Sequence, residues 1–311
     1  MVPQVGLTGT LFSLARDEMG LRQWNSSNAK SIEDFYRNSP GPGFSYTTSK
    51  GKTVIYMNTW KAAHETILLW AKRNVRPLEG EFRYKFDVIP VLNDSSKDPC
   101  IVTMIRDPVS HFLSGYNEID TRIMENEYNQ TRSRMATAPK ALFHRFHYGT
   151  KQRFEQFVTD ILSVPDTLGW TNFLKTEPLH YYSMSATLHL LEKCGVRMTA
   201  FLPSMEDFSK KWPKFVYKSC PGILPENTTA SFHTRSSHES SKDLFGIFKA
   251  AKDVWNEGGP TARAICVLHS MDYACWEGLP GGIPVLCKEV YSSTNFVTKI
   301  LDVKVASSIH G

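Results

Sequence analysis

The sequence lacks several features that would define common classes of protein. Its 311 residues contain no apolar run approaching the roughly 18 residues of a membrane-spanning helix, so we expect no transmembrane segment in this chain. Residues 1–20 lack the basic start and clean apolar stretch of a signal peptide. Dense lysine and arginine runs and RNA-binding motifs are also missing, which argues against a nucleic-acid partner.

Two further absences concern metals and nucleotides. No pair of cysteines has Cys-x-x-Cys spacing, so we expect no zinc site. The glycines of the GxxxxGK[ST] loop, which binds ATP in many kinases, are absent as well. The sequence therefore gives no support to a metal centre or to a Walker-type nucleotide site.

The cysteines and glycosylation sequons leave the compartment open. The chain has six cysteines, an even number that permits disulfides without showing them, and the three after residue 260 either pair or stay as buried thiols. Four N-x-[ST] sequons are only a hint of a secretory route, because a chain rich in serine and threonine contains some by chance. Both a lumenal domain of the Golgi or secretory pathway and a cytoplasmic protein fit.

What is present is an ordinary globular composition, with 41% hydrophobic and 22% charged residues and a net charge of +5. The mild positive charge fits an enzyme that handles anions. We expect a poorly organised segment over residues 1–50, because "NSPGPGFSYTTSKGK" reads as a turn-rich connector. A single domain over residues 51–290 and a tail over residues 291–311 complete the expected organisation.

The strongest strand signals are two runs that are apolar almost throughout. "TVIYM" (53–57) and "CIVTMI" (100–105) are typical of strands buried on both faces of a parallel sheet. "RMTAFLP" (197–203) reads as a further strand. "YKFDVIPVL" (84–92) is another candidate, which Pro90 would push to an edge.

Helical patterns alternate with these strands. After "RDP", Asp107 is a plausible N-cap and Pro108 suits the first helical position. The expected core face of this helix is spaced i, i+3, i+4, i+7, with Ser110, Ser114 and Asn117 on the other side: Val109, Phe112, Leu113 and Tyr116. Further helices are expected at about 138–147, 151–163, 185–194, 241–256 and 261–275, and a short one in "MEDFSKKWPKF", broken near Pro213. The alternation predicts a three-layer α/β fold with a central, mainly parallel sheet flanked by helices.

A positively charged side chain follows each of the two buried strands. The first leads into a turn that holds Lys61 between Trp60 and two alanines, immediately before a helix, which is a usual way to hold an anion. The second ends in Arg106, and Ser114 follows eight residues later. Because ligands bind beyond the carboxyl ends of strands in open α/β sheets, we expect Lys61, Arg106 and Ser114 to converge on one anionic ligand.

These residues resemble the sulfotransferases that use 3′-phosphoadenosine-5′-phosphosulfate (PAPS), and most closely their carbohydrate branch. "WKAAHET" stands where that family has its 5′-phosphosulfate loop, loosely K-x-[GA]-x-[ST]. "RDPVSHFLSGY" is similar to its 3′-phosphate motif R-D-P-x-x-x-x-x-S-x-Y. "HSMDYACWEGLP" and "FHTRSSHESS" are similar, more weakly, to its carboxyl-terminal stretch and to its loop over the nucleotide.

The resemblance implies a transferase that moves a sulfuryl group from PAPS to a hydroxyl acceptor, expected to be a saccharide, without a metal. Lys61 would stabilise the leaving group, while Arg106 and Ser114 would bind the 3′-phosphate. The implied cofactor-binding set also takes in the rest of the loop and the late arginine: Trp60, Ala62, Ala63, His64, Glu65, Thr66 and Arg235. Glu65 stands where the family has Ser or Thr, and Thr66 stands where its cytosolic branch has an aromatic ring.

The general base has several candidates. We favour His64, the residue closest along the chain to the expected sulfate position; the others are His111, His144, His147 and Glu65. Each of these histidines also fits an ordinary surface or core position. Lys61, Ser114 and Arg235 equally fit solvated side chains that bind no ligand.

Other readings of the whole chain stay open. One is a sulfotransferase for a small-molecule alcohol, and another is a non-catalytic nucleotide-binding relative. A nucleotide kinase on a similar sheet is disfavoured because a Walker loop and a Mg²⁺-binding set are missing. The sequence does not name the acceptor, the position sulfated or the oligomeric state.

Overall fold

The computed structural model describes residues 43–59, 62–84, 91, 98–129, 145–163, 184, 198–203, 206–229, 243, 245–275, 279 and 281–292. We expected one domain over residues 51–290, and the chain groups into two compact units. The first, here the sheet unit, comprises Ser26–Asp107 and Thr187–Ser240. The second, the helical unit, comprises Met1–Asn25, Pro108–Ala186 and Ser241–Gly311. Each unit is described by itself.

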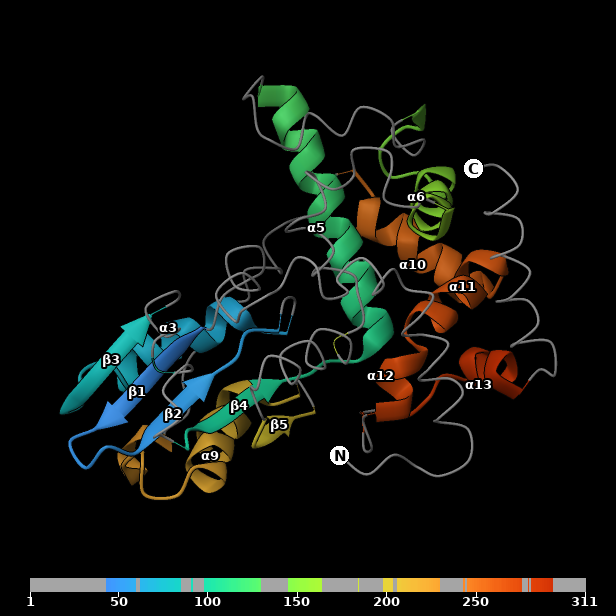
Figure 1. Ribbon diagram of the computed structural model, residues 1–311. Helices are drawn as coiled ribbons and strands as arrows, with labels where there is room; N and C mark the ends of the chain where they lie inside the picture. The colour runs from blue at the N-terminus through green and yellow to red at the C-terminus, as the bar shows by residue number, and fades with distance from the viewer. Residues whose placement is uncertain are drawn as a thin grey trace, which may run out of the picture. The chain divides into compact units, whose positions relative to one another are not determined.

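The described part of the sheet unit contains five strands in the order β3-β1-β2-β4-β5 (Figure 1). They are β1 (Phe44–Thr48), β2 (Thr53–Tyr56), β3 (Gly80–Tyr84), β4 (Cys100–Met104) and β5 (Ala200–Leu202). The pairs β2–β4 and β4–β5 are parallel, whereas β1 pairs antiparallel with both β2 and β3. The α/β class is therefore confirmed, but the expectation of a mainly parallel sheet is wrong, because the sheet is mixed.

The strands confirm three of the expected positions and correct two. β2, β4 and β5 lie within the predicted apolar runs. β1 falls in the segment that we expected to be an unstructured connector, where its Ser and Thr side chains hide the strand pattern. The edge strand β3, from Gly80 to Tyr84, was not expected. Of the predicted strand 84–92, Tyr84 ends β3 and Val91 is helical, while residues 85–90 and 92 lie outside the described ranges.

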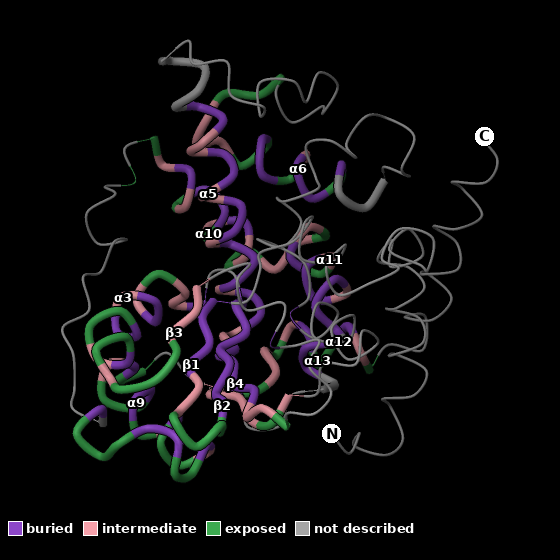
Figure 2. The backbone as a smooth tube through the Cα atoms, turned by 60° about the vertical axis from the view of Figure 1, so that its left-hand side comes forward, coloured by how far each residue is buried: buried purple, intermediate pink, exposed green. Residues whose placement is uncertain are grey.

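One face of the sheet packs on two helices, α3 (His64–Asn74) and α9 (Phe208–Ser219). The Trp212 ring lies edge-on to Tyr56 and to Trp70, with ring centroids 5.4 Å and 6.3 Å apart. Figure 2 shows the buried strands beside helices whose outer turns are exposed. Pro213 does not break α9 as we expected, because burial of its neighbours offsets the roughly 3 kcal/mol cost of a proline inside a helix.

The opposite face of the sheet is buried too. Ser45, Ile55, Ile101 and Thr103 point to this face and are at most 4% exposed. A disulfide joins Cys100, the first residue of β4, to Cys220 just after α9. In the described part of the sheet unit, β2 and β4 are therefore buried on both sides, as their apolar runs predict, whereas β5 is half-buried.

The described part of the helical unit contains α5 (Pro108–Asn129), α6 (Lys151–Ser163), α10 (Ile247–Glu257), α11 (Pro260–Leu268), α12 (Ser270–Cys275) and α13 (Val285–Ser292). Its core confirms the predicted face of α5, since Val109, Phe112, Leu113 and Tyr116 are all at most 5% exposed. α13 was not expected, and a second disulfide, Cys266–Cys287, ties it to α11. Pro108 is the first residue of α5, as predicted.

A buried ion pair crosses this core. The Arg153 guanidinium binds the Asp120 carboxylate with an Nη2–Oδ1 distance of 2.7 Å, and their side chains are 2% and 0% exposed. Tyr116 donates its hydroxyl to Oδ2 of Asp120 at 3.0 Å. Burial alone would lower the pKa of Arg153, but the hydrogen bonds and the charge attraction from Asp120, with smaller charge contributions from Tyr148 and Tyr116, together raise that pKa. The pair joins α5 to α6 inside the unit.

Other expected helices are only partly testable. The region 185–194 lies outside the described residues, as does most of 138–147. The described end of the latter, Arg145–His147, is not α-helical, so that helix does not reach its predicted end. Within the described ranges, no helix combines the length and apolarity needed to cross a membrane.

Candidate functional site

The candidate site begins at the carboxyl ends of two neighbouring strands. β2 and β4 are parallel and hydrogen-bonded partners, with Tyr56 opposite Val102. The pairing continues one residue further, since the Met57 N–H donates to the Val102 carbonyl at 2.9 Å. The segment leading to Lys61 and the segment carrying Arg106 therefore leave adjacent strands at the same edge of the sheet (Figure 1).

Two threonines fix the chain where it leaves β2. The Oγ1 atoms of Thr59 and Thr103 are 2.7 Å apart, and both residues are buried. Thr103 also bonds the Met57 carbonyl at 2.8 Å through its hydroxyl. We did not anticipate this contact, because it joins residues 44 positions apart and no local pattern signals it.

The turn before α3 has an unusual backbone. Ala63 adopts a left-handed conformation, with φ at 58°, directly before the first residue of α3. The Ala62 N–H donates to the Thr59 carbonyl at 3.2 Å, and the Ile67 N–H donates to the Ala63 carbonyl at 2.9 Å. Non-glycine residues rarely take this conformation, which costs about 1–2 kcal/mol. Four predicted site or base residues lie outside the described ranges: Trp60, Lys61, His144 and Arg235.

The first turn of α3 holds His64, Glu65 and Thr66. His64 is half-buried, and its ring stacks near Tyr56 with centroids 6.4 Å apart and planes at 24°. Glu65 is exposed, so water can solvate its carboxylate, and Thr66 is half-buried. Backbone N–H groups at such a helix start carry positive partial charge, which favours an anionic ligand near this turn.

Arg106 follows the second strand. Its side chain is half-buried, and this burial lowers the pKa of the guanidinium, while the neighbouring Asp107 opposes that shift. A partly desolvated guanidinium interacts strongly with anions and presents a planar fork that suits a phosphate group. The binding of a phosphate by Arg106 stays a prediction.

The remaining predicted residues belong to the helical unit. Ser114 lies in the second turn of α5 and is half-buried, as are Ser110 and Asn117 on the same side. His111 is buried, at 1% exposure, whereas His147 is exposed and its carbonyl accepts a hydrogen bond from the Thr150 hydroxyl. Burial makes His111 a poor candidate for a base that must meet an acceptor.

Sequence reasoning missed a histidine–aspartate pair in the helical unit. His269 Nδ1 and Asp272 Oδ2 are 2.8 Å apart, and both side chains are fully buried. The His111 ring lies 6.3 Å from that of His269 at an interplanar angle of 79°. A buried carboxylate holds an imidazole in one orientation and tautomer. The i,i+3 spacing inside "HSMD" was the available signal for this pair.

Comparison with protein-family models, curated proteins and solved structures gives no match. The site is thus defined by its own residues: a left-handed turn and helix start after β2, and an arginine after β4. In the described parts of the chain, no group of three or more metal-ligating side chains gathers. The arrangement suits an elongated anion that spans two strand ends.

Proposed function

We propose that this chain is a PAPS-dependent sulfotransferase, which transfers a sulfuryl group to a hydroxyl acceptor. One observation carries the proposal: the turn after β2 and Arg106 after β4 leave adjacent parallel strands at one edge of the sheet. PAPS carries phosphosulfate at one end of its ribose and a 3′-phosphate nearby, so it needs cationic groups at two neighbouring points. The spacing from Arg106 to Ser114 supports the same ligand.

The proposed roles follow from the chemistry of sulfuryl transfer. The reaction is an in-line displacement in which charge spreads over peripheral oxygens, so positioning and electrostatics contribute most of the rate. Lys61 neutralises charge that develops on the leaving bisphosphate. By their place in the family's motifs, Arg106 and Ser114 would bind the 3′-phosphate and Arg235 would contact the nucleotide. The leaving group is a stable phosphate, so the reaction needs no metal.

His64 is the proposed general base. It begins α3, and the helix macrodipole disfavours a protonated imidazole at that end. A neutral His64 accepts the proton of the acceptor hydroxyl as the S–O bond forms. The half-burial of His64 beside Tyr56 limits its rotation without closing it to a substrate.

The finer parts of the proposal rest on resemblance to the family. The fold would be the three-layer, P-loop-like fold of the sulfotransferases, and the acceptor would be a saccharide. The R-D-P form at Arg106 and the carboxyl-terminal stretch favour the carbohydrate branch over small-molecule sulfotransferases.

The effect of nucleotides on the melting temperature tests which cofactor the protein binds. 3′-Phosphoadenosine-5′-phosphate should raise the melting temperature much more than AMP does, because only the bisphosphate offers a 3′-phosphate to Arg106 and Ser114. At 100 times its dissociation constant, a ligand stabilises a protein by about 2.7 kcal/mol. Arg106→Ala should abolish the difference between the two nucleotides, whereas Arg76→Ala, at an exposed position after α3, should preserve it.

Equal shifts from AMP and the bisphosphate would refute the assignment of Arg106. A separate assay with radiolabelled PAPS and an array of saccharide, steroid and phenol acceptors tests transfer itself. Bisphosphate binding without transfer to any acceptor would favour the non-catalytic relative, for which the exposed Glu65 in place of Ser or Thr is the supporting observation.

A further inference from the structure

An exposed asparagine lies in a glycosylation sequon of the sheet unit. Asn227 is followed by Thr228 and Thr229, which completes the N-x-[ST] pattern. It sits in the short 3-10 helix η6 (Glu226–Thr229), and its side chain is exposed. Of the other sequon asparagines, Asn25 and Asn93 lie outside the described residues, and Asn129 ends α5.

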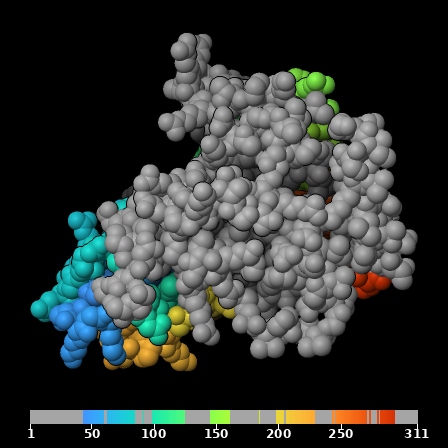
Figure 3. Space-filling view, viewed as in Figure 1, coloured from blue at the N-terminus to red at the C-terminus, as the bar shows by residue number. Residues whose placement is uncertain are grey.

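The turn around Asn227 is anchored by its neighbours. Ile223 and Leu224 are buried in the core of the sheet unit, at 8% and 3% exposure. Thr228 is buried as well, and its hydroxyl donates to the Pro225 carbonyl at 2.6 Å. The segment that includes α9 and this turn reaches the surface in the space-filling view (Figure 3). A bulky group on Asn227 would therefore extend into solvent and displace no core contact.

The disulfides give an independent reason to expect modification. Cys100–Cys220 cross-links two segments of the sheet unit, and Cys266–Cys287 cross-links two helices of the helical unit. Structural disulfides persist in oxidising compartments such as the lumen of the endoplasmic reticulum, and are rare in the cytosol. That lumen is also where N-linked oligosaccharides are attached. The same chain thus carries the bonds made in that compartment and an exposed acceptor for its glycosylation machinery.

We propose that Asn227 carries an N-linked oligosaccharide. The donor is a lipid-linked oligosaccharide pyrophosphate. The side-chain amide nitrogen of Asn227 forms a bond to C1 of the first sugar, and the bond between C1 and the pyrophosphate oxygen breaks. The lipid pyrophosphate leaves with that electron pair, and the amide nitrogen loses one proton to the transferring enzyme. No oxidation or reduction takes place.

The test uses the full chain, delivered to the secretory pathway of cultured eukaryotic cells by a cleavable leader. The purified protein is treated with peptide-N-glycosidase in ¹⁸O-labelled water, which marks each formerly glycosylated asparagine as labelled aspartate. We expect the label at Asn227. Asn227→Gln and Thr229→Ala should each lower the apparent mass on a gel by that of one glycan. Thr229→Ser should keep the apparent mass unchanged, because the sequon survives.

Non-reducing peptide mapping on the same samples reports the disulfides. An unlabelled Asn227 in protein that contains both disulfides would overturn the proposal, even if other sequons were labelled. The proposal would also be overturned if neither Asn227→Gln nor Thr229→Ala changed the apparent mass of the protein on a gel. None of these outcomes depends on sulfotransferase activity.

Discussion

At the scale of single residues, Ala63 is the strained position in the turn before α3. Its left-handed backbone is strained for alanine, and glycine would relieve that strain. We expect Ala63→Gly to raise the free energy of unfolding by roughly 0.5–1 kcal/mol, the relief minus the added entropy of the unfolded chain. Ala63→Val should lower it, since a β-branched residue fits this region poorly.

Chemical denaturation of the sheet unit measures these changes. Ala71→Gly is the matched control in the same helix, where the backbone is helical and glycine should cost about 1 kcal/mol or more. A loss of stability in Ala63→Gly similar to that in Ala71→Gly would contradict the left-handed geometry.

The same turn carries the two residues proposed for chemistry. We predict that Lys61→Ala and His64→Asn each lower turnover by on the order of a hundredfold or more, while bisphosphate binding changes little. The lysine stabilises the leaving group and the histidine removes a proton, and both effects appear mainly in the transition state. Steady-state kinetics with PAPS, together with bisphosphate titration, separates the two properties.

An exposed lysine provides the control. Lys50→Ala changes the same residue type as Lys61→Ala at an exposed position and should leave turnover unchanged. Normal turnover in Lys61→Ala would remove the main catalytic role from the proposal. Normal turnover in His64→Asn alone would move the base elsewhere and leave the cofactor assignment intact.

At the scale of elements, the sequence predicts a strand or helix best where one physical cause determines its residue pattern. β2 and β4 are buried on both faces, so nearly every residue in them is apolar and the runs stand out. β1 is held by pairing on both sides, which its own sequence does not reveal. The helix through Pro213 likewise depends on packing of Trp212 and Val216, and a local rule against proline misses it.

In the candidate site, too, some features follow from local sequence and others depend on the fold. Residue type and spacing along the chain select His64, Arg106 and Ser114 as candidates, and their roles stay predictions. The Thr59–Thr103 bond and the left-handed Ala63 depend on how β2 and β4 are brought together, so no local pattern predicted them. Six cysteines permit 15 complete pairings, which is why the two disulfides could not be assigned from the sequence.

The contact between α5 and α6 depends on the buried pair Asp120–Arg153. Asp120→Asn leaves the guanidinium buried without its counter-charge, so we expect a loss of about 3–5 kcal/mol in the free energy of unfolding of the helical unit. Tyr116→Phe removes one hydrogen bond to Asp120 and should cost about 1 kcal/mol. Thermal and urea unfolding, followed by circular dichroism, measures both.

The exposed pair Lys249–Asp253 supplies the comparison. Asp253→Asn should change the free energy of unfolding very little, because water screens an exposed i,i+4 pair. Replacing both buried partners, in Asp120→Leu/Arg153→Met, should recover much of the loss, because no unpaired charge stays inside. If Asp120→Asn were as mild as Asp253→Asn, the buried pair would not hold the two helices.

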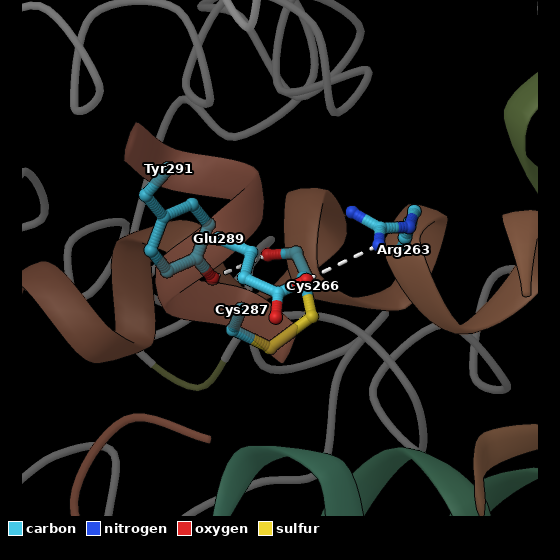
Figure 4. Close-up of a disulfide and its surroundings, with 5 residues drawn as sticks. All are labelled: Arg263, Cys266, Cys287, Glu289 and Tyr291. Carbon is cyan, nitrogen blue, oxygen red and sulfur yellow. Dashed lines mark hydrogen bonds and ion pairs between the residues drawn. A yellow bond between two sulfur atoms is a disulfide. The ribbon is translucent and has the colours of Figure 1, made fainter. Parts of the chain in front are cut away.

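At the scale of the whole molecule, each disulfide lies within one unit. Cys100–Cys220 spans 120 residues of sequence and Cys266–Cys287 spans 21. If the bond restricts mainly the unfolded chain, these separations correspond to about 5 and 3 kcal/mol of stabilisation. The smaller loop also has local support, since the Tyr291 hydroxyl donates to the Cys266 carbonyl at 2.6 Å and Arg263 pairs with Glu289 (Figure 4).

This separation predicts that losing one disulfide loosens one unit. In Cys266→Ser/Cys287→Ser, amide hydrogen exchange should accelerate in α11 and α13, because α13 loses its covalent tie, while the strands of the sheet unit keep their protection. Cys100→Ser/Cys220→Ser is the reciprocal variant and should accelerate exchange in β4 and α9. Exchange measured by mass spectrometry on matched peptides compares the two. Equal acceleration across both units in either variant would mean that the units unfold as one body, which would contradict the division of the chain into two.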